Sequence, residues 1–414
     1  MEARLERGCG LDVHQATVVA CLLVIRKSGK IQKQLRSFGT TTRELLELRE
    51  WLSSEHCNHV AMESTGVYWK PIYAVLEGDD LEIVVANALH IKKVPGRKTD
   101  VKDAEWIADL LCHGLLRPSF VPPAPIRELR DLTRYRRKLV ESRTAERNRL
   151  LKLLESANIK VASVATDVFG LSGQRMLDAL IEGKASLPEM ADLAIGRLRN
   201  KIPQLELALE GKLQEHHRFL LRLQRSRLEA VESDLSILEQ RIQQQLQPYA
   251  AQLALLREIP GVDLTLAAII IAELGVDMTV FHSPSQLSSW AGVCPGNNES
   301  AGKRKSSRVP KSNMYLKTAL VEAANAAARA KGTYLRDKFY RLKARRGYKR
   351  ASMAIAHKIL VAIYHMFSED VHYNDLGDLY LDKLNNHQVT RTLVHRLERL
   401  GYTVTLTPQQ QKAA

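Results

Sequence analysis

Apolar and polar positions in the first part of the chain repeat with two periods, one typical of strands and one typical of helices. Residues 8–38 hold short apolar runs that break at a Ser-Gly pair, which predicts two or three strands. Leu45, Leu48 and Leu52 recur at helical spacing, and Thr42 is the expected N-cap of that helix. Further elements are expected as strands over 59–65 and 81–88, a helix over 68–76 and a helix from about residue 100. This order predicts a mixed α/β sheet with helices packed on it.

The chain becomes almost wholly helical after a proline-rich break at residues 118–126. A long helix is predicted over 127–155, and its many arginines either form a solvated face or contact phosphates. Farther along, apolar residues recur with the period of a coiled coil. These residues are Leu221, Leu228, Leu235 and Ile242, with Val231 and Leu238 between them. We therefore expect segment 203–246 to form an exposed helical hairpin or arm, an element that more often joins protomers than performs chemistry.

The sequence Ile-Pro-Gly-Val at residues 259–262 lies between two predicted helices, which is the pattern of a helix-hairpin-helix motif. Its glycine permits a tight turn, and amides at the start of the second helix can bind a phosphate without reading base sequence. Six basic residues and no acid fall between Lys303 and Lys317, in a segment expected to be a loop that contacts phosphates. The residues predicted to bind nucleic acid are Gly261, Lys303, Arg304, Lys305, Arg308, Arg136 and Arg137.

The overall charge also favours a polyanionic partner. Lys and Arg number 61 against 46 Asp and Glu, a formal net charge of +15, and nucleic acid is the default partner for such an excess. The longest apolar runs, 18–25 and 264–272, are too short to span a bilayer, and no signal segment opens the chain. We therefore expect a cytoplasmic protein with no membrane partner. The five scattered cysteines include no C-x-x-C pair, which supports neither a disulfide framework nor a structural zinc site.

Two acids three residues apart, Asp100 and Asp103, mark the start of a predicted helix. One interpretation is that they only cap the helix and complement its dipole. The other is that both carboxylates face one metal ion, because residues three apart share a helix face. Asp12 and Glu63 each close an apolar strand, so neighbouring strands would bring all four acids to one sheet edge. Their mutual repulsion then implies bound divalent cations, with Mg²⁺ favoured and Mn²⁺ as an alternative.

The sequence resembles a known family in six motifs. GLDVH, MESTGVYW and KTDVKDAEWIADLL correspond to the N-terminal motifs of the DEDD insertion-sequence transposases, and REIPGVDLTLA, LSSWAGVCPGNNESAGKRK and LKTALVEAA correspond to their C-terminal domain. These transposases are relatives of the Piv and MooV DNA invertases, and several are guided by a bridge RNA. The resemblance runs from about residue 8 to about residue 370. It implies a ribonuclease-H-like fold, similar to the Holliday-junction resolvases, for the N-terminal α/β domain.

From this resemblance we expect four segments, which are a catalytic domain over 1–125, a basic helix and coiled-coil arm over 126–250, a mostly α C-terminal transposase domain over 251–370 and a tail over 371–414. The family pattern makes Asp12, Glu63, Asp100 and Asp103 the metal ligands and Ser300 the nucleophile. It implies Mg²⁺-dependent cleavage and exchange of donor and target DNA through a covalent phosphoserine. A non-coding guide RNA and a homo-oligomer, either dimer or tetramer, are the further partners implied.

Two other functions remain open at the level of sequence. A structure-specific nuclease would use the same acids with metal-activated water, so it would leave free DNA ends and no protein adduct. A non-enzymatic DNA-binding protein would use the acids only as helix caps, so Mg²⁺ would not change its thermal stability.

Overall fold

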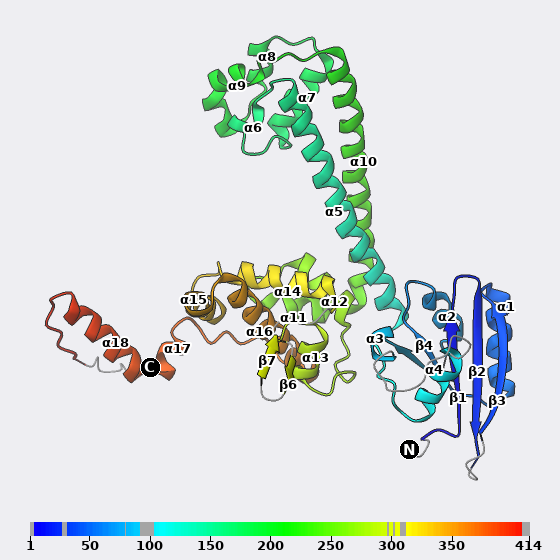
Figure 1. Cartoon of the computed structure of the whole chain (residues 1–414). Coiled ribbons are helices and arrows are strands. Elements are labelled where there is room, and N and C mark those ends of the chain that lie inside the picture. The colour runs from blue at the N-terminus through cyan, green and yellow to red at the C-terminus, as the bar shows by residue number, and fades with distance from the viewer. Residues whose placement is uncertain are drawn as a thin grey trace. The chain divides into compact units, whose positions relative to one another are not determined.

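The computed structural model of the chain forms two compact units, Met1–Val121 and Pro122–Ala414 (Figure 1). It describes residues 4–26, 31–78, 80–91, 103–295, 298–300, 303–306 and 312–407. The first unit has an α/β fold with a mixed sheet, and the second is helical apart from one short hairpin among its described residues. The predicted change from an α/β region to a helical region is therefore confirmed, while the division at residues 250 and 370 stays a prediction.

Five strands of the first unit form one sheet in the order β3-β2-β1-β4-β5. They are β1 (Arg7–Val13), β2 (Thr17–Ile25), β3 (Ile31–Gly39), β4 (His59–Glu63) and β5 (Glu82–Ala86). β1, β2 and β3 pair antiparallel, whereas β4 runs parallel to both β1 and β5. The carboxyl ends of β1, β4 and β5 consequently lie at the same edge of the sheet, the edge at which α/β sheets commonly bind ligands.

Helices cover both faces of this sheet. α1 (Thr42–Ser54) and α2 (Trp69–Leu76) pack on one face, and α3 (Ala88–Ile91) follows β5. The leucines at helical spacing in α1 are buried in this core, and each contributes about 1.5–3 kcal/mol of transfer free energy. α4 (Asp103–Cys112) packs on the opposite face, where Ala104 and Ala108 contact Cys21 of β2.

The cap of α1 differs from the sequence prediction. Thr41, not Thr42, is the N-cap, and its hydroxyl accepts a hydrogen bond from the Glu44 backbone N–H. The Glu44 carboxylate in turn accepts from the Thr41 N–H at 3.2 Å. This reciprocal capping box needs a glutamate three residues after the cap, and only position 41 has one.

Two long helices of the second unit, α5 (Ala124–Ser156) and α10 (Glu215–Leu246), pack side by side along their length (Figure 1). The heptad leucines of α10 are buried in this pair, as the coiled-coil period predicts. Their partner is α5 of the same chain, so the seam joins two helices of one protomer. The helical hairpin thus consists of α5 and α10. Of the expected span 203–246, residues 215–246 form its second helix, and its first helix lies outside that span.

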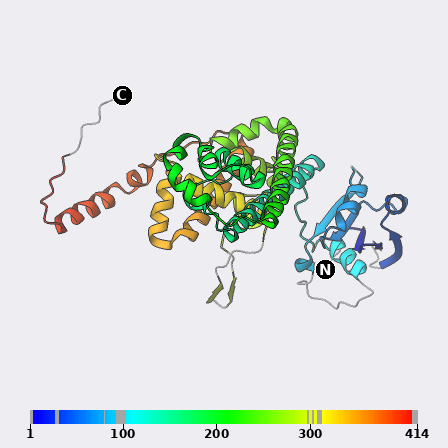
Figure 2. The ribbon, with the colours of Figure 1, turned by 90° about the horizontal axis from the view of Figure 1, so that it is seen from above.

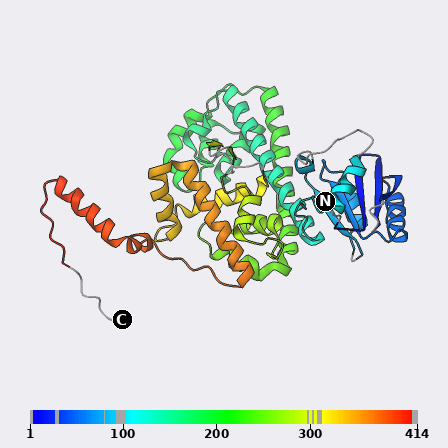
Figure 3. The ribbon, with the colours of Figure 1, turned by 60° about the horizontal axis from the view of Figure 1, so that its bottom comes forward.

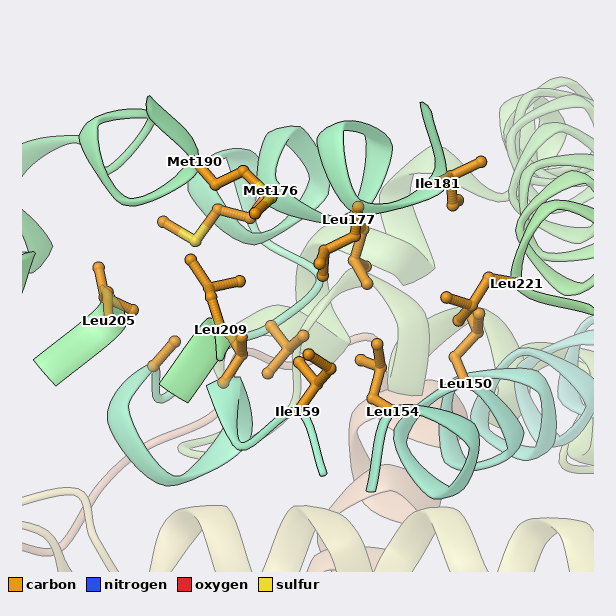
Figure 4. Close-up of a cluster of buried hydrophobic side chains, with 14 of the residues drawn as sticks. Leu150, Leu154, Ile159, Met176, Leu177, Ile181, Met190, Leu205, Leu209 and Leu221 are labelled. Carbon is orange, nitrogen blue, oxygen red and sulfur yellow. The ribbon is translucent and has the colours of Figure 1, made fainter. Parts of the chain in front are cut away.

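A small helical bundle closes the end of this hairpin. It contains α6 (Val161–Val164), α7 (Leu171–Glu182), α8 (Leu187–Asp192), the 3₁₀ helix Gly196–Lys201 and α9 (Ile202–Leu209). Figure 4 shows its core, in which Met176, Leu177 and Leu209 meet Leu154 from α5 and Leu221 from α10. Residues 203–209 therefore belong to the bundle, because their apolar positions pack into this core and not into the heptad seam.

The remaining helices of the second unit form a further body. They are α11 (Ala250–Glu258), α12 (Leu264–Leu274), α13 (Pro284–Trp290), α14 (Met314–Ala327), α15 (Tyr334–Arg346) and α16 (Tyr348–Glu369), followed by α17 (Tyr380–Leu384) and α18 (Asn386–Arg399). Figure 3 shows α15 and α16 side by side, and α16 also packs on α13 and α14. By length and composition α16 could cross a membrane, but the buried core helix of a soluble protein passes the same test.

The turn between α11 and α12 has the predicted glycine, but that glycine faces protein. Gly261 has a φ of 90°, a conformation that favours glycine. A Cβ at this position would overlap the Ala323 carbonyl and the Ala327 amide of α14, so the turn packs directly on that helix. The side chain of Asp263 accepts a hydrogen bond from Leu266 N–H at 2.8 Å and so caps α12. A phosphate at this helix end would compete with that carboxylate, and the role of Gly261 stays a prediction.

Candidate functional site

Asp12 and Glu63 lie on the same face and at the same edge of the sheet. Leu11 of β1 is in register with Met62 of the parallel strand β4, and both side chains lie in the core beneath α1 and α2. Successive strand residues point to opposite faces, so Asp12 and Glu63, one step farther along each strand, face the side that α4 covers.

Helix α4 lies directly on β1 because that strand has two glycines facing it. A Cβ on Gly10 would overlap the backbone of Ala104 and Ala108, and a Cβ on Gly8 would lie 2.8 Å from Cys112 Sγ. The helix therefore runs antiparallel to the strand, with its first residue nearest the end of β1. Gly8, Gly10 and Asp12 share one face by strand alternation. Asp103, the first described residue of α4, thus stands near the end of β1 that carries Asp12.

Polar neighbours hold the acids in the described structure. Asp12 Oδ2 lies 3.2 Å from His14 Nε2, and its side chain retains 29% of its exposure. Glu63 accepts a hydrogen bond from the Thr65 hydroxyl. One carboxylate oxygen of Asp103 is shielded from solvent. These are hard oxygen donors of the kind that Mg²⁺ prefers, and His14 and Thr65 were not singled out in the sequence because neither has a motif of its own.

Asp100 lies outside the described residues, and so do the two residues that join it to α4. Within the part of the chain that the structure describes, no three His, Cys, Asp or Glu side chains form a group that could hold a metal ion. The four-acid metal site therefore remains a prediction, in which Asp12 and Glu63 share one sheet edge and face and Asp103 begins the helix that covers that face. Its donor set fits a hard divalent cation by chemistry.

Ser300 lies on a β-hairpin, where the sequence predicts a loop. β6 (Asn298–Ser300) pairs antiparallel with β7 (Lys303–Ser306), and Ser300 is in register with Lys303 at the end of the pair (Figure 2). The candidate nucleophile is thus the last residue of its strand. Lys303, Arg304 and Lys305 are consecutive in β7, so the basic segment begins on the strand that pairs with the serine. Arg308 lies outside the described residues.

Arg136 and Arg137, predicted to contact phosphates, both have protein partners. Arg136 Nε donates to Glu239 Oε1 on α10 at 2.9 Å, which ties the two arm helices together. Arg137 Nε donates to Glu141 Oε1 at 3.2 Å, and its guanidinium lies 5.3 Å from the ring centroid of Tyr315. A nucleic acid would have to compete with these carboxylates, and the predicted contacts stay untested.

A fully buried carboxylate, Glu273, joins three helices of the second unit and was not noticed in the sequence. Arg134 of α5 binds it through two hydrogen bonds of 2.7 and 2.8 Å, and Asn313 Nδ2, at the N-cap of α14, donates to it at 2.7 Å. Arg130 donates to the Ala272 and Glu273 carbonyls at the end of α12. Burial lowers the pKa of Arg130, whereas at Arg134 the contact with Glu273 outweighs burial and raises the pKa. The signal in the sequence was a single acid in an otherwise apolar helix.

Comparison with known proteins assigns the same class to both units. Residues 9–159 match the family model DEDD_Tnp_IS110, described as "Transposase", and residues 253–341 match the model described as "Transposase IS116/IS110/IS902 family". The chain is 25% identical over 337 residues to the "Transposase for insertion sequence element IS1111A" of Coxiella burnetii. That similarity covers 76% of this chain and 79% of the relative.

The transposase models that match both units indicate a DNA-processing protein. The first match extends through α5 of the arm and the second lies beyond α10, and the chain is an IS110-family transposase by sequence similarity.

Proposed function

We propose that the protein is a Mg²⁺-dependent DNA transposase and recombinase in which Ser300 attacks a DNA phosphate. Asp12, Glu63, Asp100 and Asp103 are the proposed metal ligands, with Mn²⁺ as an alternative ion. Support comes above all from one observation, the contact of α4 with Gly8 and Gly10, which brings the start of α4, where Asp103 stands, near the end of β1 that carries Asp12. The strand that pairs with Ser300 has three consecutive basic residues and no acid, a composition suited to a phosphodiester.

The proposed step is a transesterification. The Ser300 hydroxyl loses its proton as Oγ bonds to the phosphorus, and the bond from phosphorus to one deoxyribose oxygen breaks. That oxygen takes up a proton, so one strand end becomes a free hydroxyl and the other is joined to the protein. A serine hydroxyl is a weak nucleophile, and a bound divalent cation would supply the activation and offset the charge on the phosphate. The step is reversible, and a different hydroxyl end can attack the phosphoserine to exchange strands.

Further details of the proposed function come from the resemblance of the sequence to the DEDD insertion-sequence transposases. The sheet is assigned a ribonuclease-H-like fold and residues 250–274 a helix-hairpin-helix. A guide RNA would choose donor and target by base pairing, while the protein contacts backbone and shape. The active particle is a cytoplasmic homo-oligomer. Its arm already uses the heptad seam within one protomer, so any protomer contact through the arm would use other residues.

Covalent capture tests the proposed reaction. Purified protein, RNA from the flanks of its element, Mg²⁺ and labelled DNA are mixed, denatured and examined for a protein-DNA adduct. Wild type and two control variants, Ser306→Ala on the paired strand and Asp109→Asn on α4, are expected to form the adduct. Ser300→Ala and Asp103→Asn are expected to form none. Cleavage without an adduct would instead support a nuclease that uses water, and an adduct in Ser300→Ala would exclude this serine as the nucleophile.

A further inference from the structure

A cleft of about 880 Å³ lies between α15, α16 and the segment that leads into β6. Its walls are basic on two sides, and Leu342 and Met353 contribute an apolar floor. The cationic residues are Lys338, Arg345 and Arg346 from α15, with Lys349, Arg350 and Lys358 from α16. None of these six was among the residues predicted to bind nucleic acid. The sequence does hold a signal for them, because no acid occurs between Asp337 and Glu369.

The charges of the cleft are not neutralised within the protein. Among the residues that the structure describes, none of these six side chains forms an ion pair with a carboxylate. Arg341 shows the contrast, since its guanidinium binds both Asp337 and Asp382. Several unpaired cations facing one concave surface repel each other and favour an anionic ligand with repeated charges.

Helix electrostatics accounts for only two of these six charges. Arg345 and Arg346 lie in the last turn of α15, where cations complement the helix dipole without any ligand. Lys349 and Arg350 lie in the first turn of α16, where cations oppose the dipole. The N-cap of α16 is Gly347, which offers no side chain to the free amides of this turn. An anion at this helix start would relieve the repulsion and accept from the amides.

The cleft is connected directly to the serine hairpin. Cys294 and Pro295 line it, and β6 begins three residues later at Asn298. We propose that this cleft binds the phosphodiester backbone of the DNA strand that Ser300 attacks, a step that rests on the function proposed above. The apolar floor then contacts sugars and base faces, as in grooves that bind single strands. DNA is favoured over RNA because the segment that forms the cleft continues into the strand that carries the nucleophile.

The first test removes two charges. Lys349→Gln with Arg350→Gln is compared with Arg391→Gln plus Arg396→Gln, which removes the same charge from exposed positions of α18. Fluorescence anisotropy with a short labelled single-stranded DNA is measured over a range of salt concentrations. The cleft variant is expected to bind DNA about tenfold to a hundredfold more weakly, with a salt slope lower by about two, while the α18 variant is unchanged. Arg345→Gln with Arg346→Gln gives a second cleft variant, and melting curves confirm that all variants fold.

The second test uses Cys294 of the wild-type full-length chain as a reporter. Its side chain is partly exposed in the cleft, whereas the other four cysteines are buried. DNA is expected to slow alkylation of Cys294 more than an equal concentration of RNA of the same sequence. Protection by neither nucleic acid, equal protection by both, or protection by RNA alone would overturn the proposal that this cleft binds DNA. Ser300→Ala separates the two proposals, because it should bind DNA and protect Cys294 normally while forming no adduct.

Discussion

At the scale of single residues, the buried carboxylate of Glu273 is the most sensitive position that the structure reveals. Its two arginine partners, Arg130 and Arg134, have side chains only 15% and 33% exposed. Sequence alone could not find this contact, because the arginines stand about 140 positions earlier. A hydrogen bond from Asn313 adds a third helix to the same carboxylate.

Glu273→Gln should therefore destabilise the second unit strongly. The substitution keeps the size of the side chain but leaves two guanidinium groups without their counter-charge. A loss of about 3–5 kcal/mol in unfolding free energy is expected. Urea unfolding followed by circular dichroism measures it. Glu141→Gln removes an exposed carboxylate that pairs with Lys138, and it is expected to change stability far less because water screens this pair. Equal losses in the two variants would contradict a special role for the buried group.

At the scale of elements, the heptad repeat shows what a periodic pattern specifies. The spacing predicted a helix with one apolar seam, and the seam exists. It did not identify the partner, because a period describes a face and α5 carries its matching apolar residues among many arginines. The prediction of a loop at the serine segment was wrong for a different reason. β6 has three residues and β7 has four. Such short strands contain too little alternation of residue types to outweigh the glycine and serines around them, which favour a loop.

The α5–α10 pair allows a matched test of packing. Leu228 of α10 is 1% exposed, whereas Leu223 of the same helix is 51% exposed. Leu228→Ala should weaken the arm by about 2–5 kcal/mol, since it leaves a cavity in the seam. Leu223→Ala should change stability by less than about 0.5 kcal/mol. Hydrogen exchange of amides in α5 and α10 locates the effect, and unchanged protection in Leu228→Ala would show that the seam does not hold the pair together.

At the scale of the whole molecule, the sequence predicted the class of protein and the order of its regions correctly, but it did not predict several local details of the structure. The α/β sheet, the helical region and the transposase class all followed from patterns that extend over many residues. The shared face of Asp12 and Glu63 needed strand register, which a single sequence does not contain. The cleft on α15 and α16 could not be predicted because it depends on how the two helices pack. Gly10 belongs to the motif GLDVH but was assigned no role, because a glycine in a strand can mark a bulge or a bend as well as a close approach.

Metal binding is expected to stabilise the full-length protein. If the acids hold Mg²⁺, the apparent stability at an ion concentration about a hundred times the dissociation constant rises by about 2.7 kcal/mol. Thermal melting with Mg²⁺, and again after a chelator is added, measures the change. Asp12→Asn should abolish the shift, and Asp109→Asn on the exposed side of α4 should keep it. A wild-type melting temperature that does not respond to Mg²⁺ would favour acids that only cap helices.

The two glycines of β1 determine which substitutions can alter the sheet edge that carries the acids. At Gly10 the spacing between strand and helix is set by backbone atoms of both elements, with no side chain between them. No rotamer can adjust such a contact, so repacking of the surrounding core does not alter it. The separation of Asp12 and Asp103 is thus insulated from most core substitutions, and a single methyl group at Gly10 is the perturbation to which it is most vulnerable.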